Sequence, residues 1–177
     1  MNRTALLAAL LASATAAPLA AETHRVDPAE GAGALQEALI LAQPGDVIEL
    51  GEGRFALTDG LSLDVDGVTV RGAGMDRTIL DFTGQQGAGE GLLVTSDKVT
   101  LRDFAVENPK GDGIKSKGAD MIVYSGIRVE WTGGPKATNG AYGIYPVEST
   151  GVLVTNSKVS GASDAGIYVG QSRDITV

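Results

Sequence analysis

The sequence predicts an all-β fold, a parallel β-helix in which short strands wind into stacked coils. Short apolar runs that begin with Gly-Leu or Gly-Ile recur at Gly91, Gly113, Gly143 and Gly166, with spacings of 22, 30 and 23 residues. Two further apolar sets recur with them, and no segment between them is a helix of the length that a crossover connection needs. Glycine is also abundant, at 25 of 177 residues, which suits a fold with many turns.

The composition excludes several kinds of site and partner. The chain has no cysteine, which rules out disulfides, a thiolate nucleophile and a cysteine-ligated zinc. Its one histidine, His24, lies near the expected start of the mature chain, which argues against a Ser-His-Asp triad. The formal net charge of −8 argues against a nucleic-acid partner.

Residues 1–21 have the pattern of a secretory signal peptide. Arg3 supplies a positive charge, an uncharged apolar run covers residues 5–12, and small residues follow. The apolar run is shorter than the roughly 20 residues of a membrane-spanning helix. We therefore expect a bacterial protein that is periplasmic or secreted, with no membrane span.

Residues 22–45 are expected to form an N-terminal segment with a short capping helix. Leu35, Ala38, Leu39 and Ala42 mark one apolar helical face, and the pair Pro44-Gly45 ends the helix. Such a helix would cover the open end of the sheets and protect their edge.

The coils of the predicted β-helix occupy residues 46–177, beginning with the strand at Val47. Three runs in each repeat of about 23 residues predict three strands per coil. The chain stops within a coil at residues 175–177, without a capping segment. We therefore expect this chain to be the N-terminal part of a longer protein.

Side chains of a strand alternate between its two faces, which divides each Gly-Ile run into inward and outward positions. The inward set is Leu92, Ile114, Ile144 and Ile167, and the outward set is Leu93, Lys115, Tyr145 and Tyr168. The spacing of 30 exceeds a normal coil by about seven residues. This excess lies in residues 131–142, whose Gly-Gly-Pro and Asn-Gly pairs predict a protruding loop.

The chain resembles the superfamily of right-handed parallel β-helix proteins that contains pectate lyases, polygalacturonases and alginate-modifying enzymes. The resemblance covers about residues 32–177 and includes ALQEALILAQPGDVIEL, VTVRGAGMDRTILDF, KGDGIKSKGAD and SDAGIYVGQS. It is closest to secreted bacterial parallel β-helix domain proteins of unassigned activity. The resemblance implies a right-handed, single-stranded solenoid, and this scaffold hosts lyases, hydrolases, epimerases and non-enzymes.

The candidate catalytic residues are Lys115, Lys117 and Asp112. A lysine base needs a lowered pKa, which Lys117 would supply as a neighbouring positive charge on the same strand face. The alternative is a pair of solvated lysines. A polygalacturonase-like pair of Asp112 and Asp164 is disfavoured by the lack of a GHG motif and of a second Asp beside Asp164, and both more readily bond turn amides. Calcium is the cation that the resembling lyases use, and the sequence itself identifies no ligand for it.

The candidate substrate-binding residues are Tyr145, Tyr168, Trp131, Tyr142 and Arg128. Aromatic rings could stack on sugar C–H groups, and cations could pair with a uronate carboxylate. The alternatives are that the tyrosines pair across coils as strand-forming residues and that Trp131 covers the side of the solenoid.

The favoured function is that of a secreted carbohydrate-active protein that binds or modifies an acidic polysaccharide, with a lyase or epimerase mechanism ahead of hydrolysis. The alternatives are a non-catalytic polysaccharide-binding module and a structural surface module that assembles through its open coil. The sequence predicts no particular polymer, metal or oligomeric state.

Overall fold

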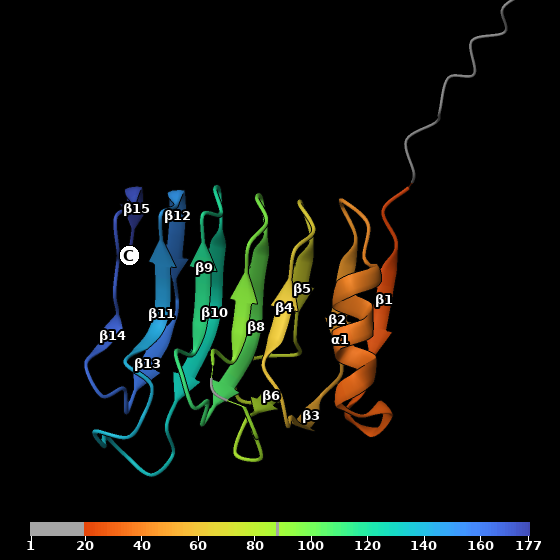
Figure 1. Cartoon of the computed structure of the whole chain (residues 1–177). Helices are drawn as coiled ribbons and strands as arrows, with labels where there is room; N and C mark the ends of the chain where they lie inside the picture. Colours follow the sequence, from red (N-terminus) through yellow and green to blue (C-terminus); the bar gives the residue numbers. More distant parts are fainter. Residues whose placement is uncertain (1–19, 88) are drawn as a thin grey trace, which may run out of the picture.

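The computed structural model describes residues 20–87 and 89–177, where parallel strands stack side by side (Figure 1). The larger sheet holds ten strands: β1 (Thr23–Val26), β2 (Val47–Leu50), β3 (Gly53–Ala56), β5 (Thr69–Arg71), β6 (Thr78–Asp81), β8 (Thr100–Glu107), β10 (Val123–Glu130), β12 (Thr150–Thr155), β13 (Lys158–Ser160) and β15 (Arg173–Thr176). The smaller sheet holds five: β4 (Leu61–Leu63), β7 (Leu92–Val94), β9 (Ile114–Lys117), β11 (Tyr142–Val147) and β14 (Ala165–Ile167). The predicted parallel β-helix is confirmed.

The predicted inward column is also confirmed by the strand register. Leu92 pairs with Ile114, Ile114 with Ile144, and Ile144 with Ile167, each in the next coil. Leu92, Ile114 and Ile144 are at most 1% exposed, so the column lies in the core between the two sheets. Burial of such a column of aliphatic side chains is the main stabilising contribution in a solenoid.

The second and third runs of each repeat join into one bent strand in two of the coils. β8 and β10 are each eight residues long and pair along their length. The bend falls where Asp103 and Gly126 lie opposite each other with φ of 62° and 65°. The structure therefore divides its strands between two sheets, and the larger sheet contains the corner that separates the second run from the third.

The N-terminal end is covered by α1 (Ala32–Leu41), which follows the short 3₁₀ turn η1 (Pro28–Glu30), as Figure 1 shows. Leu35 and Leu39 are each 1% exposed and belong to the core, so the predicted capping helix is confirmed. The structure adds β1, which pairs with β2 and begins the first coil earlier than the sequence indicated.

The predicted signal peptide lies almost wholly outside the described residues. Within residues 20–87 and 89–177, no helix is long and apolar enough to cross a membrane.

The glycines that begin the Gly-Leu and Gly-Ile runs form a second column. A Cβ on Gly91 would lie 2.7 Å from the carbonyl oxygen of Gly113, and one on Gly143 would lie 2.8 Å from that of Gly166. A Cβ on Gly113 would overlap the carbonyl oxygen of Gly143. Successive coils therefore approach so closely at this turn that no side chain fits between their backbones.

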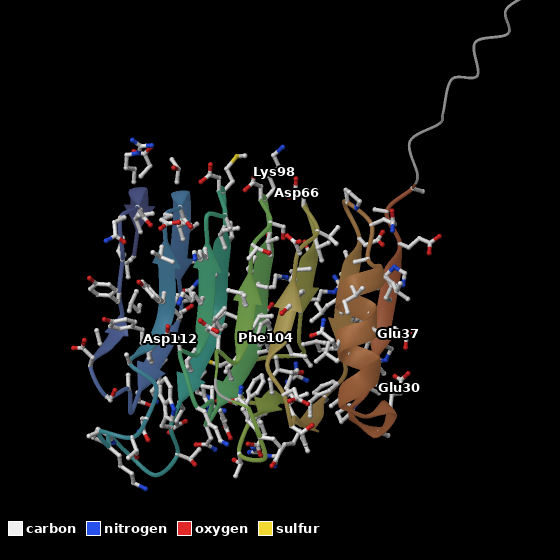
Figure 2. All side chains as sticks on the ribbon, viewed as in Figure 1. Glu30, Glu37, Asp66, Lys98, Phe104 and Asp112 are labelled. Carbon is white, nitrogen blue, oxygen red and sulfur yellow. The ribbon has the colours of Figure 1, made fainter. Side chains whose placement is uncertain are left out.

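Aspartates form a ladder at the opposite end of the smaller sheet's strands. Asp66 Oδ1 accepts a hydrogen bond of 2.8 Å from the backbone N–H of Asp97, and Asp97 Oδ1 accepts one of 2.8 Å from that of Asp120. Asp120 Oδ1 then accepts one of 2.7 Å from the backbone N–H of Thr150. Asp66, labelled near Lys98 in Figure 2, thus begins a series in which each carboxylate bonds the following coil.

Asp46 fastens the N-terminal coil, and we expect it to make stability depend on pH. Its carboxylate accepts hydrogen bonds from the backbone N–H groups of Glu22 and Gln43, both 2.8 Å, and lies 2.9 Å from His24 Nε2. These contacts lower its pKa from the usual 3.8 to about 2. The carboxylate therefore stabilises the fold fully above pH 4 and ceases to do so as the pH falls to 2. Urea unfolding at a series of pH values should show this loss.

The matched variant Asp46→Asn tests the assignment because it keeps one oxygen acceptor and removes the ionisable group. We expect its free energy of unfolding at pH 7 to lie below that of the wild type and to change less between pH 4 and pH 2. Equal slopes for the two proteins over that range would contradict the role of Asp46.

Candidate functional site

Three tyrosines gather on the outer face of the smaller sheet. The rings of Tyr142 and Tyr168 stack with centroids 4.4 Å apart at an interplanar angle of 13°. Tyr145 lies 4.8 Å from Tyr142 and 5.4 Å from Tyr168, with its ring tilted against both. Tyr168 is 41% exposed, and the other two are half-buried. The cluster, called here the tyrosine site, presents aromatic surface to solvent beside a strand of charged residues.

Lys115 continues this face on the neighbouring strand. It pairs with Tyr145 in register, as predicted, and its Nζ lies 5.0 Å from the centre of the Tyr145 ring. The same Nζ donates a hydrogen bond of 3.1 Å to Glu90 Oε1 and lies 3.8 Å from Asp112 Oδ2. The tyrosine site is thus bordered by one ammonium and two carboxylates, all of them at least partly buried.

The two carboxylates have pKa values displaced in opposite directions. Burial and the charge of Glu90 raise the pKa of Asp112, and together they outweigh the backbone N–H of Tyr142 and the Lys115 ammonium, which lower it. Burial also raises the pKa of Glu90, but its own backbone N–H and the ammonium groups of Lys115 and Lys117 together lower this pKa by more. Opposite displacement of neighbouring acids is typical of sites that move protons, so Asp112, whose pKa is raised, is the better candidate for a proton-transfer group.

The expected effect of Lys117 on Lys115 is wrong. Burial lowers the pKa of Lys115, but the hydrogen bond to Glu90 and the charges of Glu90 and Asp112 raise it by more, so the net shift is upward. A lysine base needs the opposite shift. Lys115 is therefore a fixed cation, and Lys117 is an exposed residue two positions along the same strand.

Asp112, labelled in Figure 2, has the turn role that the sequence offered as its alternative. Its Oδ1 accepts a hydrogen bond of 3.1 Å from the backbone N–H of Tyr142 in the next coil. The contact orients the carboxylate and leaves Oδ2 directed at Lys115, so the turn role and a chemical role are compatible.

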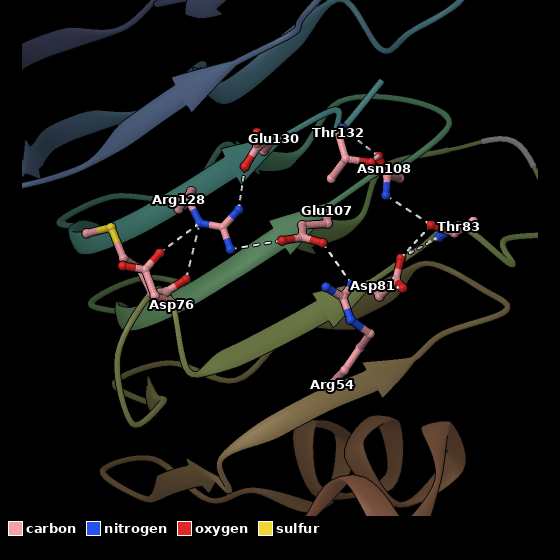
Figure 3. A network of polar contacts seen from close by, with 10 residues as sticks. Arg54, Asp76, Asp81, Thr83, Glu107, Asn108, Arg128, Glu130 and Thr132 are labelled. Atoms are coloured by element: carbon pink, nitrogen blue, oxygen red, sulfur yellow. Dashed lines mark hydrogen bonds and ion pairs between the residues drawn. The ribbon is translucent and has the colours of Figure 1, made fainter. Parts of the chain in front are cut away.

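Arg128 belongs to a different site from the tyrosines, on the outer side of the larger sheet (Figure 3). Its guanidinium lies 2.9 Å from Glu107 Oε1, 2.5 Å from Glu130 Oε2 and 3.4 Å from Asp76 Oδ1. Arg54 contacts the other oxygen of Glu107 at 2.7 Å. With its side chain only 11% exposed and fully engaged by acids, Arg128 is a structural residue, and the prediction that it binds substrate with the tyrosines is wrong.

Trp131 is buried, contrary to the expectation that it stacks on a sugar. It is 5% exposed, belongs to the hydrophobic core and donates a hydrogen bond of 2.7 Å from its indole N–H to the carbonyl oxygen of Pro109. The loop that follows it folds against the coil, so Trp131 covers the side of the solenoid. Of the five predicted binding residues, the structure thus brings together Tyr142, Tyr145 and Tyr168.

Glu90 is the residue of this site that the sequence analysis missed. Gly91 donates its backbone N–H to the carbonyl oxygen of Asp112, and Gly113 donates its N–H to that of Tyr142. The residues before the repeated glycines therefore form a column of their own. The signal was available, because Glu90 precedes Gly91 as Asp112 precedes Gly113.

Calcium finds no matching set of ligands at the tyrosine site. The part of the chain that the structure describes holds no group of three or more histidine or acidic side chains that could bind a metal ion. Glu90 and Asp112 both face the Lys115 ammonium, which occupies the position between them that a cation would take.

These coils define a β-solenoid protein, and its smaller sheet carries an aromatic outer face. A family model described as right handed beta helix region matches residues 66–177, and the chain belongs to that family. An alginate lyase from Paenibacillus sp. str. FPU-7 has a similar structure, with a TM-score of 0.58 and 18% sequence identity over 84% of this chain and 75% of that one. None of the curated proteins matches the chain. These findings confirm the right-handed fold.

Proposed function

We propose that the tyrosine site binds an acidic polysaccharide and modifies it as a lyase or an epimerase. The observation that carries the proposal is the contact of the cluster of three tyrosine rings with Lys115. Lys115 lies between Glu90, whose pKa is lowered, and Asp112, whose pKa is raised. The name of the structurally similar alginate lyase agrees with a polysaccharide as ligand. A periplasmic or secreted location is part of the proposal and is supported by the pattern of residues 1–21.

The chemistry follows from the three charged groups. Both reactions begin when the proton on the carbon next to the uronate carboxylate is removed, and Lys115 would stabilise the negative charge that then develops. The ionised carboxylate of Asp112 is the proposed base that accepts this proton, its raised pKa makes it a stronger base, and Glu90 holds Lys115 in position. In a lyase, the bond from the neighbouring ring carbon to the glycosidic oxygen would then break and Asp112 would return the proton to that oxygen. In an epimerase, water would return a proton to the opposite face of the sugar. Tyr168 and Tyr142 supply the ring surface on which a sugar stacks.

The test is incubation with alginate, pectate and glycosaminoglycans, following the ultraviolet absorbance of unsaturated ends for a lyase and the NMR signals of inverted uronates for an epimerase. We expect Asp112→Asn to lower turnover by about a hundredfold or more while keeping affinity, because the amide oxygen can still accept the Tyr142 N–H. We expect Tyr168→Ala to lower affinity roughly tenfold, equivalent to about 1.4 kcal/mol.

Leu153→Ala is the matched control for Tyr168→Ala. Leu153 is 38% exposed and lies on β12 of the larger sheet, away from the tyrosine site. The Leu153→Ala variant should bind the polysaccharide with the same affinity as the wild type. Equal affinity of the Tyr168→Ala variant and the wild type for every polymer would overturn the proposed site.

A non-catalytic binding module is the second candidate, and one observation favours it. The Lys115 ammonium already donates a hydrogen bond to Glu90, which reduces its capacity to stabilise charge on a substrate. Affinity that depends on Tyr168, with no product from any of the polymers, would select this candidate.

A further inference from the structure

A second surface site lies beside the loop of residues 131–142. The loop and the turn around Lys110 enclose a hollow of about 410 Å³. Lys110 and Lys136 are among its lining residues, and none of the lining residues is acidic. This is unusual in a chain with a net charge of −8. Two ammonium groups without a counter-charge make the hollow a region of positive potential.

The two lysines differ from most other cations of this protein because no carboxylate pairs with either one in residues 20–87 and 89–177. Lys110 Nζ makes one hydrogen bond, of 3.2 Å, to the carbonyl oxygen of Gln86. A hollow of about 300 Å³ over β2 and β5 offers a contrast, since its Arg25 and Arg71 both pair with Glu49. Of these two hollows, the one beside the loop therefore holds the cationic hydrogen-bond donors that no carboxylate engages.

Hydrogen bonds hold the walls of this hollow in place. Asn108 Oδ1 accepts bonds of 2.9 and 3.0 Å from the backbone N–H and the hydroxyl of Thr132, and its amide donates to Thr83 (Figure 3). Asn139 Nδ2 donates to the carbonyl oxygens of Gly134 and Gly161, which ties the loop to the next coil. A preformed site loses little entropy when a ligand binds.

We propose that this hollow binds an oxyanion group, a carboxylate or a sulfate, carried on a saccharide. Lys110 and Lys136 would donate to its oxygens, as ammonium groups do in charge-assisted hydrogen bonds. The hollow and the tyrosine site are connected through the chain, because Lys110 lies two residues before Asp112 and Asn139 lies three before Tyr142. The saccharide carrier rests on the proposed function, whereas the oxyanion contact does not.

The single tryptophan of the chain provides a direct measurement, because Trp131 lines the hollow. Trp131 fluorescence is titrated with inorganic sulfate, with an oligogalacturonate and with a neutral oligosaccharide of equal length. We expect a saturable change with the sulfate and the oligogalacturonate, weakening as salt concentration rises, and none with the neutral sugar.

The double variant Lys110→Gln/Lys136→Gln should weaken the binding of both anions at least tenfold. Both lysines are exposed, so circular dichroism should show an intact fold. Lys98→Gln/Lys158→Gln is the control of equal charge, with exposed lysines outside the hollow, and it should bind as the wild type does. No response to sulfate or the oligogalacturonate, or a response that the Lys110→Gln/Lys136→Gln variant retains, would overturn the oxyanion site.

The variant Tyr168→Ala separates this inference from the proposed function. It should leave the sulfate response unchanged and weaken only the oligogalacturonate. If the lysine-dependent sulfate response persists while Tyr168→Ala binds the oligogalacturonate as tightly as the wild type, the hollow stands and the tyrosine site fails.

Discussion

Replacing Gly113 with alanine is expected to destabilise the protein by about 3 kcal/mol, measured as the free energy of unfolding in urea. The new Cβ would overlap the carbonyl oxygen of Gly143 and Cγ1 of Val129. The first of these is backbone, which can yield only if two coils move apart. Their separation would weaken the pairing of β9 with β11 and the packing of Ile144 behind it.

Gly33→Ala is the matched control, the same substitution where the new Cβ would meet no atom within 4 Å apart from its chain neighbours and the backbone of its own helix. Gly33 lies within α1, where alanine favours the helix over glycine by about 1 kcal/mol, so this variant should be more stable than the wild type. A Gly113→Ala variant as stable as the wild type would show that the coils tolerate a wider spacing at this turn.

Replacing Arg128 with alanine should destabilise the protein by about 3 to 5 kcal/mol, as the removal of one partner from a buried ion network does. Glu107 is 4% exposed and would keep only Arg54 as a counter-charge, while Glu130 and Asp76 would lose the guanidinium that they share. Thermal or urea unfolding measures the loss.

Arg102→Ala provides the comparison for this variant. Arg102 and Asp103 form an ion pair of 3.2 Å with side chains 45% and 40% exposed, and such a pair contributes at most about 1 kcal/mol. Similar unfolding midpoints for the Arg128→Ala and Arg102→Ala variants would contradict a dominant role for the buried network.

The variant Arg128→Lys should retain wild-type affinity for polysaccharide, because Arg128 is remote from the tyrosine site.

The fold could be predicted because its information is local and repeated. The column of Leu92, Ile114 and Ile144 needs only the alternation of a strand and a constant spacing, and both are visible in the sequence. The joining of the second and third runs was not predictable in this way. It depends on the backbone of Asp103, an aspartate with positive φ inside an otherwise continuous strand.

The candidate site was predictable only in part, because the outward position of a residue on its strand does not show which charged side chains it will contact. Tyr145 and Lys115 follow from the register alone, whereas the contact of Lys115 with Glu90 joins residues 25 apart through a turn. Arg128 was misassigned for a related reason. Its outward position was visible, but two of its acidic partners, Asp76 and Glu107, lie on other segments of the chain.

The aspartate ladder gives the assembly of this solenoid a direction. Asp66, Asp97 and Asp120 each lend a carboxylate to the backbone of the coil that comes after them, never to the one before. When the chain is synthesised from its N-terminus, each folded coil therefore presents a carboxylate that can accept a hydrogen bond from the backbone of the next coil. The first coil in this order is the one that α1 covers. Growth in one direction, each layer templated by its predecessor, is the folding order that this arrangement favours.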